Sequence, residues 1–202
     1  MSFILLCTGR SGSTMLQRAL DSHAGIGSCG ELYDPAELSG TYNDAKGVIG
    51  CKLNYLLPRV KWAEADWSWL IEHNEIDVIW LDRNDKLAQF ASERIANITG
   101  AWDHPAADRP TITVDPGHFE RWKYHLSQRR RQVGRMMAAH RQTVATYEQL
   151  CDEWDATIGR LERFIGVAQE PLHKLTERGE TRPISDVIDN YCELTPTTPP
   201  IQ

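Results

Sequence analysis

The chain has 202 residues and carries 22 Lys and Arg against 28 Asp and Glu, a formal net charge of −6. This length suits one domain with a substantial core. The acidic balance excludes a global positive field that would recruit nucleic acid or an anionic membrane. No apolar stretch is long enough to span a bilayer, and no basic residue precedes the apolar run at residues 3–7. We therefore expect a cytoplasmic protein without nucleic-acid or membrane partners.

Apolar runs and helical patterns alternate along the chain. The patterns predict strands at residues 2–8, 47–53, 76–81 and 142–147, and helices at residues 13–23, 62–73, 85–98, 116–140, 152–165 and 184–194. This alternation predicts an α/β fold with a central parallel β-sheet flanked by helices, in a single domain over residues 1–194 with a disordered tail at 195–202. Ligands of such sheets bind beyond the carboxyl ends of the strands, so residues that follow strands are the first candidates for a site.

The five cysteines and seven histidines are spread along the sequence without CxxC or HExxH spacing. This distribution indicates neither a disulfide framework nor a zinc site. We expect thiols and no bound metal.

A turn rich in Gly and Ser joins the first predicted strand to the first predicted helix. Backbone N–H groups in such a turn converge on one anion at the helix N-terminus. Gly9 and Gly12 allow positive φ, the Arg10 guanidinium can bind two oxygens, and three residues add hydroxyl donors: Ser11, Ser13 and Thr14. A Walker A loop would carry lysine at position 13, so an ordinary ATP or GTP loop is disfavoured. The alternative is a tight turn with a Ser cap.

The sequence GRSGSTML, residues 9–16, resembles the 5′-phosphosulfate loop of sulfotransferases that use 3′-phosphoadenosine-5′-phosphosulfate (PAPS). The likeness is greatest to the bacterial branch that sulfates trehalose and Nod-factor sugars, which usually has proline where Gly9 stands. Residues 76–96 are similar to the second cofactor element of the family, an Arg after a strand and a Ser in the next helix. The resemblance implies a P-loop nucleotide-kinase-like sulfotransferase fold.

The same resemblance implies a set of cofactor-binding residues. The loop residues Arg10, Ser11, Gly12, Ser13 and Thr14 would hold the 5′-phosphosulfate. Arg83 and Ser92 would hold the 3′-phosphate. Arg178 and Arg182, in a segment that resembles the C-terminal basic loop of the family, would cover the cofactor.

Sulfuryl transfer also needs a base for the acceptor hydroxyl and a group that stabilises the leaving phosphate. Bacterial sulfotransferases place a glutamate base where Glu31 stands, in what we expect to be a Gly-rich turn. Arg10 would stabilise the leaving group, and Lys52 matches a strand lysine that touches sulfuryl or acceptor oxygens. His23 is an alternative base, although its place at a helix C-terminus also suits the helix dipole.

The sequence therefore predicts a metal-independent sulfotransferase that converts PAPS and an acceptor hydroxyl to a sulfate ester and 3′,5′-adenosine bisphosphate. The branch that it resembles implies a carbohydrate acceptor, with another small molecule as the alternative. We expect a shallow acceptor pocket or one completed by a second subunit in a homodimer. Two other functions stay open: a P-loop nucleotide kinase or NTPase, in which Asp82 would bind Mg²⁺, and a non-catalytic nucleotide-binding module.

Overall fold

The structure is a computed structural model that describes residues 2–32, 48–56, 64–102, 109–175 and 182–195. The side chains at positions 28, 29 and 64–66 lie outside this description. The chain forms two compact units. The first comprises Met1–Asn84 and Ser127–Thr176, and the second comprises Asp85–Leu126 and Glu177–Gln202. Within the described residues no helix is long and apolar enough to cross a membrane.

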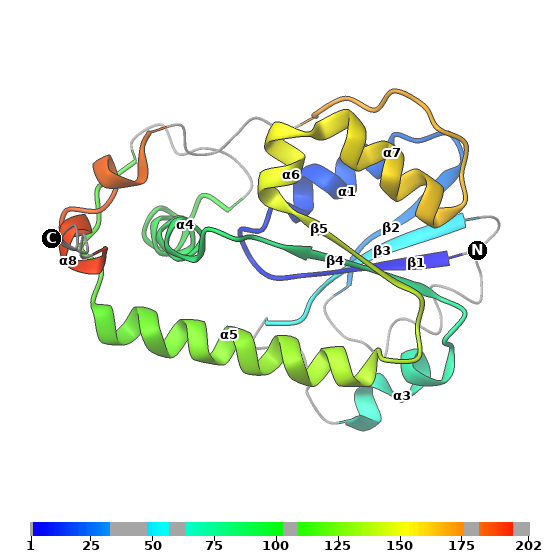
Figure 1. The fold of residues 1–202 in the computed structure, drawn as a ribbon, viewed down its shortest axis with the longest axis horizontal. Helices are drawn as coiled ribbons and strands as arrows, with labels where there is room; N and C mark the ends of the chain where they lie inside the picture. The colour runs from blue at the N-terminus through cyan, green and yellow to red at the C-terminus, as the bar shows by residue number, and fades with distance from the viewer. Residues whose placement is uncertain (1, 33–47, 57–63, 103–108, 176–181, 196–202) are drawn as a thin grey trace, which may run out of the picture. The chain divides into compact units, whose positions relative to one another are not determined.

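The first unit is built on a five-stranded sheet in the order β2-β3-β1-β4-β5 (Figure 1). Each neighbouring pair is parallel. The strands are β1 (Ser2–Cys7), β2 (Ile26–Leu32), β3 (Val48–Asn54), β4 (Asp77–Asp82) and β5 (Gln142–Thr146). The predicted α/β fold with a central parallel sheet is confirmed.

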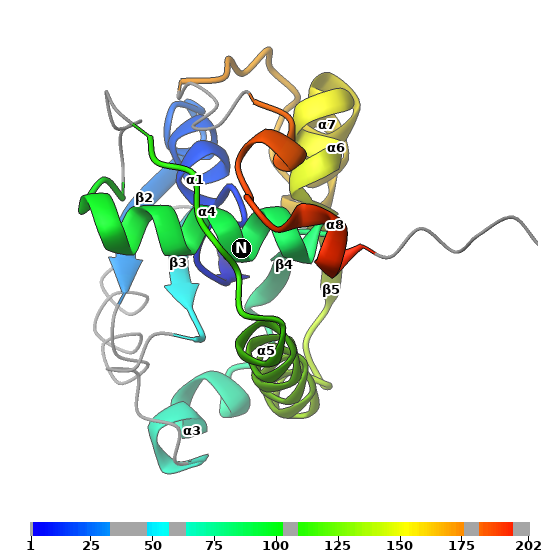
Figure 2. The same cartoon turned by 90° about the vertical axis from the view of Figure 1, so that its left-hand side faces the viewer.

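Helices pack on both faces of this sheet (Figures 1 and 2). One face is covered by α1 (Ser13–Asp21), α6 (Tyr147–Asp152) and α7 (Trp154–Ile165). The other is covered by α3 (Glu64–Glu72) and by the part of α5 (Pro116–Met136) that begins at residue 127. Burial on two faces explains why β1 and β4 are continuous apolar runs.

The second unit has its own small apolar core. It contains α4 (Lys86–Thr99), the first half of α5, a 3₁₀ turn at Ile184–Asp186 and α8 (Tyr191–Leu194). Asp85 caps α4 by accepting a hydrogen bond from the Ala88 N–H at 2.8 Å, and Gly100 ends the helix with φ of 71°. Both ends of α4 therefore follow from local sequence.

Three predicted elements differ from the structure. The strand β2 was expected to be a turn, because its sequence IGSCGEL is rich in glycine and its large aliphatic residues, Ile26 and Leu32, stand at its two ends. The last strand ends at Thr146, whose side chain forms a capping box with Gln149 and starts α6. The helix predicted over residues 184–194 is interrupted between the 3₁₀ turn and α8.

The cysteines also depart from expectation. Cys51 is disulfide-bonded, whereas Cys7, Cys151 and Cys192 are free thiols. Disulfides persist in oxidising compartments, so the cytoplasmic location stays a prediction.

Gly50 gives the first stability test. A Cβ atom at this position would lie 2.0 Å from Cζ of Phe3, whose ring lies across the glycine. We expect Gly50→Ala to lower the free energy of unfolding by about 1–3 kcal/mol, the usual cost of overpacking a core. Urea denaturation measures this loss. At Gly27, on the edge strand β2, the nearest atom would be 3.5 Å from a new Cβ. Gly27→Ala is the control, and an equal loss in both variants would contradict the packing argument.

Candidate active site

The turn between β1 and α1 has the geometry of an anion-binding loop. Gly12 is the N-cap of α1 with φ of 86°, and no side chain caps the helix. The first-turn N–H groups therefore face outward at the positive end of the helix dipole. Arg10 also has positive φ, at 60°, whereas Gly9 does not. The conformational freedom of glycine is therefore used at Gly12 and not at Gly9. A left-handed Arg is a strained residue of the kind that clusters at ligand sites.

Two of the loop hydroxyls form hydrogen bonds with other groups of the protein. Ser11 is fully buried and its hydroxyl donates to the Thr8 carbonyl at 2.7 Å. Ser13 hydrogen-bonds the Cys7 thiol, which lies at the end of β1 beneath the loop. Burial raises the pKa of Cys7 to about 12, so this thiol stays protonated and is no nucleophile. Any ligand contact of Ser11 would therefore come from its backbone N–H.

Arg83 lies directly at this loop. Its Nη1 donates to the carbonyl of Arg10 at 3.2 Å, and its guanidinium lies 4.3 Å from the centre of the Tyr147 ring. The same ring packs against Gly12, where a Cβ atom would come within 2.7 Å of Tyr147 Cδ2. Tyr147 thus fixes the loop and the arginine relative to each other. The signal for this residue in the sequence is its place at the end of the last predicted strand, residues 142–147.

Glu31 and Lys52 form an ion pair on neighbouring strands. Lys52 Nζ lies 2.8 Å from Glu31 Oε2, and the two residues are register partners of β2 and β3. A register shift between Ser28 and Glu31, with Gly30 at φ of 75°, turns the strand so that the carboxylate reaches the lysine. Glu31 therefore lies on a strand and not in the expected turn. The lysine side chain is 6% exposed and the glutamate side chain 28%, so the carboxylate is accessible from solvent.

The ion pair is close to the loop. Lys52 is the register partner of Leu5 on β1, two residues before Cys7, the residue beneath the loop. Asn54, also on β3, extends its amide toward Gly9. Glu31 and Lys52 thus lie on the adjacent strands β2 and β3, and Arg10 lies in the loop that follows the next strand, β1.

His23 occupies a structural position. Its Nδ1 accepts the N–H of Gly25 at 2.9 Å, and its Nε2 lies 2.8 Å from the Ala168 carbonyl, which places the proton on Nε2. The ring is buried at the C-terminal end of α1, away from the loop at the other end of this helix. Glu31 is therefore the better placed of the two candidate bases.

Asp82 does not have the environment of a magnesium ligand. Arg130 donates to its Oδ2 at 3.4 Å and stacks 3.4 Å from the centre of the Trp80 ring. Arg130, on α5, therefore pairs with the carboxylate at the end of β4. Within the described parts of the chain, no three His, Cys, Asp or Glu side chains are grouped to hold a metal.

The remaining predicted cofactor residues belong to the second unit. Ser92 is on α4 in the second unit, and Arg182 also belongs to that unit. Gln89, on the same helix α4, is fully buried. Arg178 lies outside the described residues. The roles of Ser92, Arg178 and Arg182 stay predictions.

No protein-family model matches this chain, and no curated protein matches it. Among solved structures, the chain is similar to mouse sulfotransferase SULT7A1 complexed with PAP, with 12% sequence identity and a TM-score of 0.49. The match covers 84% of this chain and 59% of the mouse protein. The chain therefore spans well under two thirds of that protein's length.

Gly12 provides a test of the loop geometry. Gly12→Ala places a methyl group on a left-handed residue and against Tyr147, so we expect a loss of about 1–3 kcal/mol in the free energy of unfolding. Gly9→Ala is the matched control in the same loop, because a Cβ there would meet Asn54 Nδ2 only at 3.8 Å. Its effect should stay within about 0.5 kcal/mol. Urea denaturation of both variants measures the two changes in the free energy of unfolding. A loop that tolerates both substitutions equally would not have the described conformation.

Proposed function

We propose that the protein is a sulfotransferase that moves a sulfuryl group from PAPS to an acceptor hydroxyl. The observation that carries this proposal is the Lys52–Glu31 ion pair beside an anion loop that lacks the Walker lysine. An anion loop by itself fits any phosphate ligand. A carboxylate held near such a loop adds a base that can accept a proton from a nucleophile.

The loop and the two arginines would bind the donor. The N–H groups at the start of α1 and the Arg10 guanidinium would contact the 5′-phosphosulfate. Arg83, already in contact with the loop, would contact a phosphate by its planar guanidinium. Ser92, Arg178 and Arg182 complete the proposed donor site on the strength of the family resemblance.

The transfer follows from these positions. The acceptor oxygen attacks sulfur and forms the new S–O bond, while its proton passes to Glu31. The bond from sulfur to the bridging oxygen breaks, and its electron pair stays on the 5′-phosphate of the bisphosphate product. Loop N–H groups and Arg10 stabilise this growing charge, and Lys52 stabilises the sulfuryl oxygens. The ion pair uses Oε2 of Glu31, so we assign Oε1 to the acceptor hydroxyl.

The kinase or NTPase alternative fits the site less well. Such an enzyme needs a lysine on the transferred phosphate and a carboxylate on Mg²⁺. Ser13 stands in place of the lysine, and Asp82 is paired with Arg130. A carbohydrate acceptor and a dimeric assembly are proposals that rest on the sequence resemblance.

Replacing Glu31 tests the mechanism. Glu31→Gln keeps the shape of the side chain and removes the base, so turnover of PAPS to the bisphosphate with a mixture of sugar acceptors should fall by about 10²–10⁴. Affinity for 3′,5′-adenosine bisphosphate should be retained, because the carboxylate would face the acceptor. Glu75→Gln, at an exposed residue before β4, is the control and should be unchanged in both assays.

Two outcomes would contradict this role. Full turnover in Glu31→Gln would remove Glu31 as the base. Loss of bisphosphate binding in the same variant would show that the ion pair only supports the fold of the loop.

A further inference from the structure

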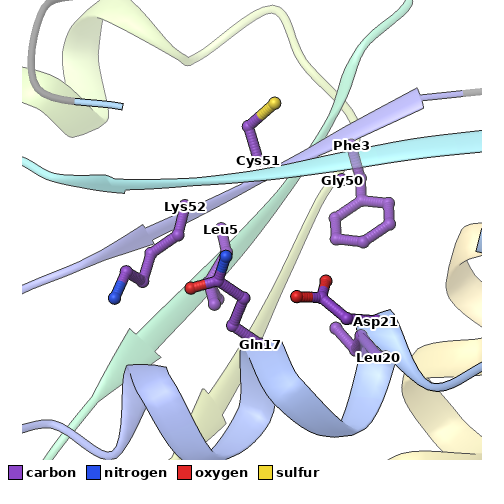
Figure 3. Close-up of a pocket in the computed structure, with 8 residues that line it drawn as sticks. All are labelled: Phe3, Leu5, Gln17, Leu20, Asp21, Gly50, Cys51 and Lys52. Carbon is purple, nitrogen blue, oxygen red and sulfur yellow. The ribbon is translucent and has the colours of Figure 1, made fainter. Parts of the chain in front are cut away.

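Asn54 is the last residue of β3 and lies beside the anion loop. Its register partner is Cys7, the last residue of β1, after which the loop begins. Side chains alternate along a strand, so Asn54 faces the same side of the sheet as Lys52, two residues before it. Figure 3 shows Lys52 extending from β3 toward α1, with Cys51 pointing the other way. Asn54 therefore lies on the α1 face, nearer the carboxyl edge than the ion pair of Lys52 and Glu31.

A local hydrogen bond fixes the orientation of the Asn54 amide. Its Oδ1 accepts the N–H of Leu56 at 3.1 Å, an Asx turn that follows the strand. In the part of the chain that the structure describes, no protein group accepts a hydrogen bond from Nδ2. The residue is only 8% exposed, and a buried donor is stabilised when it has a partner. The NH₂ group is therefore a donor directed at a ligand.

Gly9 leaves this donor open on the side of the loop. Gly9 does not have the positive φ that would require glycine, so its missing side chain has another consequence. A Cβ atom at Gly9 would lie 3.8 Å from Asn54 Nδ2, and no other described atom outside the adjacent residues would come within 4 Å of it. A side chain at position 9 would therefore cover Nδ2, and glycine keeps it accessible.

The strand order places Asn54 between the two parts of the proposed site. The strand β3 lies between β1, which leads into the loop, and β2, which carries Glu31. In the proposed transfer the loop holds the 5′-phosphate and Glu31 takes the acceptor proton, so the sulfur must lie between them. Arg83 follows β4, which lies on the other side of β1. The sulfuryl oxygens would therefore lie over the end of β3, where Lys52 and Asn54 are the donors.

We propose that the Asn54 amide donates a hydrogen bond to a sulfuryl oxygen of PAPS, a role that rests on the sulfotransferase function above. The Lys52 ammonium is already paired with Glu31 and supplies only part of the donors that three sulfuryl oxygens need. A neutral amide adds a donor without adding charge, and its fixed orientation lowers the cost of ordering it on binding. The bisphosphate product has no sulfuryl group, so this contact distinguishes the donor from the product.

Calorimetric titrations of the full chain with PAPS and, separately, with 3′,5′-adenosine bisphosphate test this contact without an acceptor. Asn54→Ser removes the NH₂ group and keeps a side-chain oxygen that can accept the Leu56 N–H. We expect PAPS to bind about 10- to 100-fold more weakly, the loss of a hydrogen bond to a charged group. Bisphosphate affinity should stay within about twofold of the wild type. Asn74→Ser, at an exposed residue before β4, is the matched control and should change neither affinity.

Gly9→Ala is a second variant that leaves Asn54 in place. Its methyl group would lie against Nδ2 and hinder access to it. PAPS should bind about three- to tenfold more weakly, with bisphosphate affinity unchanged. Urea denaturation of Asn54→Ser and Gly9→Ala establishes that both variants are folded. If Asn54→Ser does not fold, unchanged PAPS affinity in Gly9→Ala overturns the proposal.

The role of Asn54 and the sulfotransferase function fail by different results. Equal weakening of PAPS and the bisphosphate in Asn54→Ser would show that Asn54 only supports the loop. Unchanged PAPS affinity in this variant would remove the contact. Both results leave the sulfotransferase function in place when the wild-type chain binds the two nucleotides. A wild-type chain that binds neither would contradict the function itself, and the role of Asn54 with it.

Discussion

The ion pair between Lys52 and Glu31 determines how the carboxyl edge of the sheet is arranged. The Lys52 ammonium is almost fully buried, and a buried ammonium without a carboxylate would be strongly unfavourable. Its partner comes from the edge strand β2, so the pair joins this irregular strand to the interior of the sheet. The bulge at Gly30 is the backbone adjustment that brings the carboxylate into place. A single charge requirement thus positions a carboxylate beside the loop that ends β1.

The loop and Arg83 form the second half of this edge. Positive φ at Arg10 and Gly12 turns the chain from the buried strand into α1 and leaves the helix N-terminus without a side-chain cap. Tyr147 contacts the loop on one side and the guanidinium on the other. The anion donors follow β1 and β4, and the candidate base lies on β2, which β3 separates from β1. All lie toward the carboxyl edge of one sheet, the kind of preorganisation that the proposed group transfer requires.

Local sequence predicted the parts of the site that depend on one strand and the residues after it. The apolar run to Cys7, the Gly-Ser turn and Arg83 after β4 are all of this kind. Glu31 became a candidate through the family resemblance, but its strand was missed because β2 is rich in glycine and has few large apolar residues. The partners of His23, Asp82 and Tyr147 come from distant segments, and no local pattern encodes such contacts.

The most direct measurement is a calorimetric titration of the protein with 3′,5′-adenosine bisphosphate and, separately, with ATP and Mg²⁺. The sulfotransferase account predicts micromolar or tighter binding of the bisphosphate, with ATP at least about tenfold weaker, a difference of about 1.4 kcal/mol. The bisphosphate at 100 times its Kd should also raise the free energy of unfolding by about 2.7 kcal/mol. Equal or tighter binding of ATP with Mg²⁺ would contradict the account and favour a nucleotide kinase or NTPase.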